Sequence, residues 1–150
     1  MPKSLAQIYT HIVFSTKNRS PLIKRRIRNE LRLYMSKILQ NHDTPVLEIE
    51  AVKDHVHILC SLSKNNALCK IIEEVKKSSS KWIKTKDEIN PEFYWQNGYG
   101  AFSVSSSQLD DVSDYIRNQE KHHRRITFQE EFRRLLTRYN LECDERYVWD

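Results

Sequence analysis

Apolar residues recur along the chain first at the spacing of a strand and then at the spacing of a helix. Positions 7–15 alternate between apolar and polar residues, which predicts a strand with two partly apolar faces. Ser20-Pro21 has the form of a helix start, with a capping serine followed by proline at the first helical position. Apolar residues at spacings of three and four then predict a helix that runs to about Asn41.

The middle of the chain continues with a strand pair, a helix and a fourth strand. The apolar runs 46–52 and 55–62 predict a hairpin, because only Lys53-Asp54 separates them. Helical spacing predicts a second helix over about 68–83, and a fourth strand follows over about 99–104.

Two capping-box patterns predict further helices after the fourth strand. Ser107 is followed by Asp110, and Thr127 is followed by Glu130. The order strand, helix, strand, strand, helix, strand is the ferredoxin-like or RRM-like βαββαβ pattern. We therefore expect an α+β fold in a single domain spanning 1–150, with an antiparallel sheet and additional C-terminal helices. In this arrangement two helices cover one face of the sheet, and we expect the other face to stay open.

Two histidines separated by one residue stand on the third predicted strand. Side chains at i and i+2 of a strand project to the same face, so His55 and His57 point together while Val56 points away. If Val56, Ile58 and Cys60 pack under the helices, the histidines lie on the open face, where a ligand can reach them. Two neutral ring nitrogens at this spacing can bind one divalent metal ion.

A tyrosine and a glutamine stand four residues apart on the helix predicted after the fourth strand. Tyr115 and Gln119 therefore share one face of that helix. The amide oxygen of Gln119 is a hard ligand suited to Mg²⁺ or Mn²⁺. The phenol of Tyr115 can attack a phosphodiester and hold the broken strand as a phosphotyrosine.

Charge favours a polyanionic partner. The net charge is +5 and the pI is about 9.1. Between Lys17 and Lys37 the chain has eight basic residues and one acid, and residues 117–138 are also predominantly basic. The run Lys24-Arg25-Arg26 is either a solvated helix face or a DNA contact, and we favour the contact because of the imbalance in sign.

Cysteine usage and hydropathy bear on the compartment. Three cysteines without zinc-ligand spacing favour a reducing compartment over a disulfide framework. The sequence shows neither a signal-peptide core nor an apolar run of membrane-spanning length. We expect a cytoplasmic protein with no membrane partner.

The motifs taken together resemble a known family. His55-Val56-His57 resembles the HUH motif. The stretch 98–105, the segment Tyr115-Ile116-Arg117-Asn118-Gln119 and His122-His123 are similar to single-tyrosine HUH transposases. These are the transposases of the insertion-sequence 200/605 group and their relatives at repetitive extragenic palindromes. The resemblance runs from the first strand to about Arg125.

The resemblance implies an activity and a site. Such proteins cut and rejoin single-stranded DNA beside imperfect hairpins, with a tyrosine linked to a 5′-phosphate. By position Tyr115 is the nucleophile, and His55, His57 and Gln119 are ligands of Mg²⁺ or Mn²⁺, with no organic cofactor. The family works as a homodimer, and whether Tyr115 acts in its own subunit or in the partner's stays open.

The resemblance also suggests DNA contacts. Lys17 and Arg19 match a basic turn of the family. Apart from the resemblance, the basic residues Arg25, Lys77 and Lys81 are further candidates.

The other histidines and the tail receive no catalytic role. We expect His122-His123 near a helix end to be solvated or to face DNA. No sequence pattern around His11 points to a functional role for it. Beyond the capping pattern at Thr127, the tail 126–150 carries no assignable motif.

Two alternatives remain beside the transposase. One is a non-catalytic module that binds single-stranded nucleic acid on its sheet, although the strands lack an evident pair of base-stacking aromatics. The other is a domesticated relative that processes palindromic repeats without moving itself.

Overall fold

The fold is described from a computed structural model that covers residues 3–86, 92–146 and 148–149. The strands and α-helices, in chain order, are β1 (Tyr9–Ser15), α1 (Arg28–Asn41), β2 (Val46–Ala51), β3 (His55–Ser61), α2 (Leu68–Lys86), β4 (Gly100–Val104), α3 (Leu109–Arg117), α4 (Gln119–His122) and α5 (Phe128–Arg138).

The four strands form one antiparallel sheet in the order β2-β3-β1-β4. This order places β1 and β3 at the centre, and it is the order that the split βαβ pattern generates. The predicted α+β class and ferredoxin-like βαββαβ topology are therefore confirmed.

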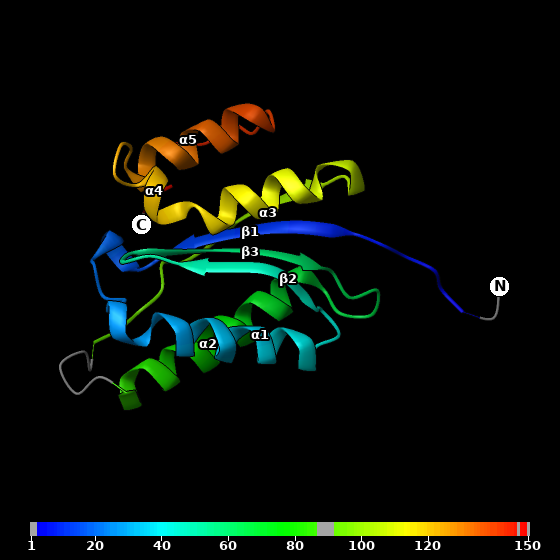
Figure 1. Cartoon of the computed structure of the whole chain (residues 1–150), viewed down its shortest axis with the longest axis horizontal. Helices are drawn as coiled ribbons and strands as arrows, with labels where there is room; N and C mark the ends of the chain where they lie inside the picture. The colour runs from blue at the N-terminus through cyan, green and yellow to red at the C-terminus, as the bar shows by residue number, and fades with distance from the viewer. Residues whose placement is uncertain (1–2, 87–91, 147, 150) are drawn as a thin grey trace.

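One face of the sheet packs against α1 and α2, which lie side by side below it (Figure 1). Val56, Ile58 and Cys60 of β3 point to this side and are fully buried in the main core, as their alternation predicts. His55, His57 and Leu59 consequently point to the opposite face.

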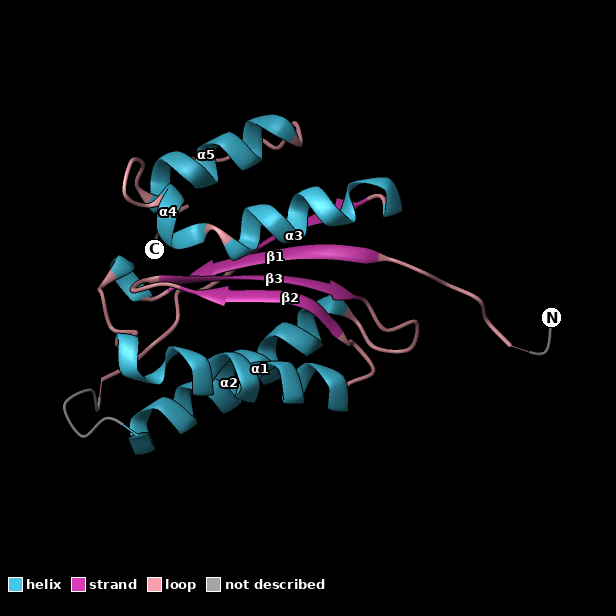
Figure 2. Cartoon of the chain, viewed as in Figure 1, coloured by secondary structure: helices cyan, strands magenta, loops and turns pink. Residues whose placement is uncertain are grey.

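The opposite face is not open. The helices α3, α4 and α5 cover it, so the sheet lies between two helical layers (Figure 2). α3 packs over β2 and β3, whereas the apolar side of α5 packs on Val13 and Phe102 of β1 and β4. The expectation of an open face is wrong, because α5 is an amphipathic helix that must bury its own apolar stripe.

A glycine lets α5 approach the sheet closely. A Cβ atom on Gly100 would lie 2.6 Å from Cε2 of Phe132, closer than real side chains approach. The aromatic ring of Phe132 thus occupies the space that any larger residue at position 100 would need.

The first helix begins later than the sequence predicts. Ser20-Pro21 does not start it, because α1 begins at Arg28 after a 3₁₀ turn over Arg25–Ile27. The backbone N–H of Ile23 instead donates to the carbonyl of Lys53, 2.9 Å away, and the Ile23 side chain is buried. This contact ties the segment to the β2–β3 turn in an extended form.

The two predicted capping boxes have different outcomes. Ser107 is not a helix cap, because a 3₁₀ turn over Ser106–Gln108 precedes α3. Thr127 does cap α5, where its hydroxyl oxygen accepts from the backbone N–H of Glu130 at 3.2 Å. Within the described ranges, no helix combines the length and apolar character that crossing a bilayer requires.

Candidate active site and metal centre

His55 and His57 are fully buried beneath α4 and α5. The Nδ1 atom of each ring forms a hydrogen bond with a neighbouring side chain. Asp54 Oδ1 lies 2.7 Å from Nδ1 of His55. His11, from the adjacent strand β1, places its Nε2 2.7 Å from Nδ1 of His57. With both Nδ1 atoms occupied, the two Nε2 atoms face one common point.

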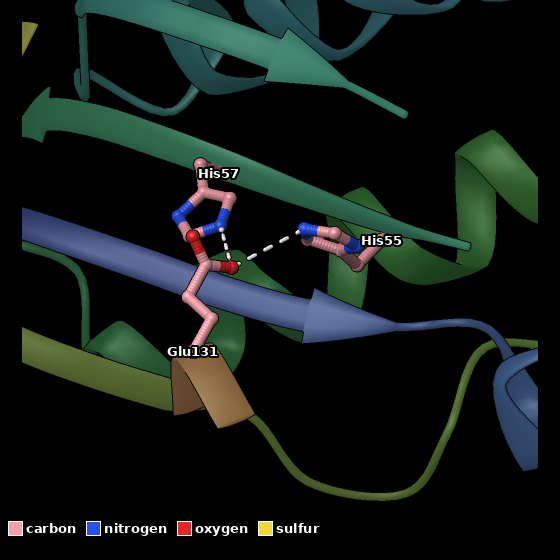
Figure 3. A group of neighbouring side chains, drawn as sticks. All are labelled: His55, His57 and Glu131. Carbon is pink, nitrogen blue, oxygen red and sulfur yellow. Dashed lines mark hydrogen bonds and ion pairs between the residues drawn. The ribbon is translucent and has the colours of Figure 1, made fainter. Parts of the chain in front are cut away.

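A carboxylate from α5 reaches that point. Glu131 Oε1 lies 2.9 Å from Nε2 of His57 and 3.4 Å from Nε2 of His55 (Figure 3). The Glu131 side chain is 1% exposed, so its charge depends on these partners rather than on water.

Gln119 joins the same cluster. Its Oε1 lies 3.3 Å from Nε2 of His55, and its amide nitrogen donates to Oε2 of Glu131 at 3.0 Å. Gln119 and Tyr115 do not share one continuous helix as expected, because α3 ends at Arg117 and Gln119 begins α4. The side chains nonetheless converge, since Gln119 points back under α3.

Tyr115 lies at the edge of the cluster, partly buried, and its hydroxyl donates to Oε2 of Glu131. Its ring centroid is 5.9 Å from that of His57. The candidate nucleophile and the candidate metal ligands of the sequence therefore meet in one place, on two sides of Glu131.

His123 belongs to this site and is not the solvated or DNA-facing residue that its place near a helix end suggests. Its Nε2 lies 3.1 Å from both Oε1 of Gln119 and Oε1 of Glu131. The side chain is 13% exposed. His11 is likewise buried and engaged, although no sequence pattern marks it.

Glu131 is the main site residue that the motifs do not reveal, because it lies outside the segment 98–123 that resembles the family. A signal was present: Glu131 interrupts the apolar stripe formed by Phe128, Phe132 and Leu135 on α5. A carboxylate on the buried side of an amphipathic helix needs a partner, and here the partners are imidazoles.

Burial and neighbouring charges shift the pKa values of the three buried histidines in different directions. Burial lowers the pKa of His11 to about 3 and also lowers the pKa of His57. Burial opposes the charged form of His55 too, yet its contacts with Asp54 and Glu131 raise the pKa of that ring. The same buried pair therefore shifts in opposite directions: the two carboxylates beside His55 favour its charged form, whereas burial favours the neutral form of His57.

The pKa values of Glu131 and Tyr115 shift in opposite directions. Burial disfavours the carboxylate of Glu131, but the surrounding imidazoles dominate and hold its pKa far below the usual range. Burial and the neighbouring Glu131 charge raise the pKa of Tyr115. The phenol is thus protonated in this arrangement, as its hydrogen bond to Glu131 requires.

The donor set fits a divalent metal ion. One ligand atom each from His55, His57 and Glu131 lie within 4.8 Å of one another, and all three residues are buried. Ligands about 2.1 Å from a metal and at right angles lie about 3 Å apart, and Oε1 of Glu131 lies 2.9 Å and 3.4 Å from Nε2 of His57 and of His55. Imidazole nitrogens with a carboxylate and the amide oxygen of Gln119 suit Mn²⁺, Mg²⁺ and similar ions.

The candidate DNA contacts divide between the two sides of the sheet. Arg19 and Arg25 line a cavity of about 710 Å³ that also borders His123 of the site. Lys77 and Lys81 lie on α2, on the face of the sheet remote from the histidines. Lys17 lies in a 3₁₀ turn next to Arg19.

A ferredoxin-like sheet with a buried His-x-His pair and a facing tyrosine defines the HUH class that the sequence resembles. Residues 4–119 match the family described as "Transposase IS200 like". The chain belongs to this family, whose members are DNA transposases.

Relatives agree with this placement. The chain is 21% identical over 118 residues to the ISDra2 transposase TnpA of Deinococcus radiodurans, a match that covers 75% of this chain and 84% of that protein. A crystal structure of a transposase from Deinococcus radiodurans R1 is similar with a TM-score of 0.64 and 17% identity, over 77% of this chain and 93% of that one.

A second solved structure is that of a REP-associated tyrosine transposase bound to a REP hairpin. It is similar with a TM-score of 0.61 and 16% identity, over 81% of this chain and 72% of that one. At these identities the two structures establish the common fold.

Proposed function

We propose that this transposase cleaves and rejoins single-stranded DNA through a covalent link to Tyr115. In cleavage, the Tyr115 oxygen forms a bond to the scissile phosphorus, and the bond from phosphorus to the 3′ oxygen breaks. The phenol proton leaves and the 3′ oxygen takes up a proton, so the products are a 5′-phosphotyrosine and a free 3′-OH. Rejoining is the reverse attack by a 3′-OH.

One observation carries the proposal: the hydroxyl of Tyr115 lies against a buried cluster that can hold a divalent cation. His55, His57, Gln119 and Glu131 are the residues that would hold Mg²⁺ or Mn²⁺, and no organic cofactor is invoked. Such an ion, when bound, withdraws charge from the scissile phosphate.

The protein side chains supply orientation. Asp54 and His11 fix the two histidine rings through Nδ1, so that both Nε2 atoms stay directed at the same point. Glu131 holds the hydroxyl of Tyr115 at the edge of that point. Orientation of this kind is worth several orders of magnitude in rate when the reacting atoms are held close.

The remaining features of the proposal follow the family. We assign the substrate as DNA with a hairpin beside the cleavage site, a choice supported by the relative that was solved with a REP hairpin. We also assign a homodimer, a cytoplasmic location and one domain over the whole chain. Lys17, Arg19 and Arg25 are the better candidates for DNA contact, because Lys77 and Lys81 lie behind the sheet.

The test is a search for the covalent adduct. Wild-type protein is incubated with labelled single-stranded hairpin DNA and Mn²⁺, and adducts are resolved on a denaturing gel. We expect Tyr115→Phe to lose the adduct and keep its affinity for DNA, and Tyr94→Phe, at an exposed tyrosine, to behave as wild type. DNA binding without any adduct in the wild type would favour the non-catalytic binding module instead.

A further inference from the structure

Three cavities surround α4 and adjoin one another. The cavity of about 710 Å³ shares Arg124, Arg125 and Ile126 with a second of about 570 Å³. The second shares His122, Ile126 and Arg134 with a third of about 390 Å³. Because they share lining residues, the three cavities lie next to one another around α4, and we call them together the depression.

The two ends of this depression lie on different sides of the candidate site. The first cavity begins at Arg19 and passes His123, at the side of the histidine cluster. The third lies between α3 and α5, and its lining includes Tyr115 and Glu131. A strand that follows the depression would therefore end at the proposed nucleophile.

Basic side chains line the depression along its length. We call six of them the basic track: Arg19, Lys121, Arg124, Arg125, Arg134 and Arg138. None of the six forms an ion pair with any residue in the part of the chain that the structure describes. Two neighbouring arginines do form ion pairs. Nη2 of Arg25 lies 2.6 Å from Oε1 of Glu120, and Nε of Arg133 on α5 lies 2.7 Å from Oε1 of Glu145.

The acids within the depression leave the track positive. Asp54 is bound to His55 and Glu131 is enclosed by imidazoles, so neither neutralises an arginine of the track. Glu120 is paired with Arg25, and only Asp111 forms no ion pair with a described residue. A row of such cations along a depression is the electrostatic complement of a phosphodiester backbone.

We propose that the basic track is the path along which the DNA strand reaches Tyr115, with Arg134 and Arg138 contacting the phosphates beside the scissile one. This inference rests on the proposed function for its end point. It assigns the contact to the chain's own C-terminal part, because five of the six residues lie beyond 119, where the family match ends.

The helix α5 supports the assignment by its geometry. Arg134 and Arg138 are four residues apart, so they share one exposed side of α5, next to the buried side that carries Glu131 and Leu135. Guanidinium groups bind phosphate in a fork, which makes a pair of arginines at this spacing a suitable clamp for adjacent phosphates.

Binding is measured in a Tyr115→Phe background, so that no covalent product forms. The probes are a labelled single-stranded hairpin oligonucleotide and, as a source of free anion, inorganic phosphate in competition. We expect Arg124→Gln with Arg125→Gln, and Arg134→Gln with Arg138→Gln, each to weaken DNA binding about 10-fold or more. The slope of log affinity against log salt should fall by about 0.7 for each phosphate that the variant no longer binds.

Arg133→Gln is the matched control, since this residue lies on the same helix but is paired with Glu145. All substituted arginines are exposed, and thermal melting checks that each variant is folded. The proposal would be overturned if the variants lost no more DNA affinity than Arg133→Gln does, or if the slope of log affinity against log salt did not change. Competition by millimolar phosphate as strong as that by DNA would also overturn it, because the site would then bind a free anion and not a strand.

The experiment distinguishes a failure of the basic-track proposal from a failure of the proposed function. An adduct in the wild type with unaffected binding in the arginine variants would refute the track and leave the tyrosine chemistry standing. Weakened binding in the variants without any adduct in the wild type would uphold the track as a DNA surface and refute the chemistry.

Discussion

Glu131 Oε1 lies 2.9 Å from Nε2 of His57, although 74 positions separate the two residues in the chain. The contact joins the central strand β3, within the matched family segment, to the helix α5 that follows it. It makes α5 part of the site, because the carboxylate is buried among the groups proposed to hold the metal ion.

The first prediction concerns this carboxylate as a metal ligand. We expect Glu131→Gln to weaken Mn²⁺ binding by about 10-fold or more, because an anionic ligand is replaced by a neutral amide of the same shape. Isothermal titration with Mn²⁺ in the absence of DNA measures the affinity directly. Glu130→Gln on the exposed side of α5 is the control, and an equal affinity in both variants would remove Glu131 from the metal site.

The second prediction concerns the residue that holds His55. Asp54→Ala removes the acceptor at Nδ1 and should weaken Mn²⁺ binding by about 10- to 100-fold, the usual cost of removing such a partner. Asp54→Asn retains an oxygen that can accept from Nδ1 and should recover most of this loss. Equal losses in the two variants would show that the charge of Asp54 matters, and not its hold on the ring.

The third prediction is a pH dependence of stability in metal-free protein. The pKa of His11 is about 3 in the folded state and about 6.5 when unfolded, so between these values the unfolded chain binds the extra proton. Stability should therefore fall as pH drops below about 6.5, with a slope from His11 of up to about 1.4 kcal/mol per pH unit.

His11→Gln removes that titration and keeps an amide near the position of Nε2, the atom of His11 that contacts Nδ1 of His57. We expect its free energy of unfolding, from urea titrations between pH 7 and pH 5, to depend less on pH than that of the wild type. His55 has a raised pKa, so its contribution is present below about 6.5 and is lost as pH rises, in both proteins. Parallel pH profiles would mean that His11 is not held neutral by the fold.

Local patterns were enough to predict the sheet and half of the site. The alternation of Val56, Ile58 and Cys60 with the histidines determines which side of β3 faces α1 and α2, because a strand has a period of two. The proximity of Gln119 to His55 followed from family resemblance and not from spacing, since α3 ends between Tyr115 and Gln119.

The rest depends on packing between distant segments. His11 shows no motif, and it becomes significant only because β1 pairs with β3 and sets Val13 opposite His57, with His11 two positions along the same face. The covering of the histidines depends on where α5 docks, which in turn depends on Phe102 and Gly100 of β4. No pattern within positions 126–150 alone specifies that docking.

The fourth prediction tests the docking itself. Gly100→Ala places a Cβ atom 2.6 Å from Cε2 of Phe132, so the ring or the helix α5 must move. We expect a loss of about 1–3 kcal/mol in the free energy of unfolding, the usual cost of overpacking a core. Because Glu131 precedes Phe132 on α5, the same shift should weaken Mn²⁺ binding.

A second substitution distinguishes overpacking from an effect on β4 alone. Phe132→Leu removes the ring atoms that the new methyl group would meet, at its own cost in buried apolar area. In a double-mutant cycle, Gly100→Ala should therefore cost less in the Phe132→Leu background than in the wild type, by about 0.5 kcal/mol or more. Additive losses, measured by urea unfolding, would place the damage in the strand, and α5 would then not depend on the glycine for its approach to the sheet.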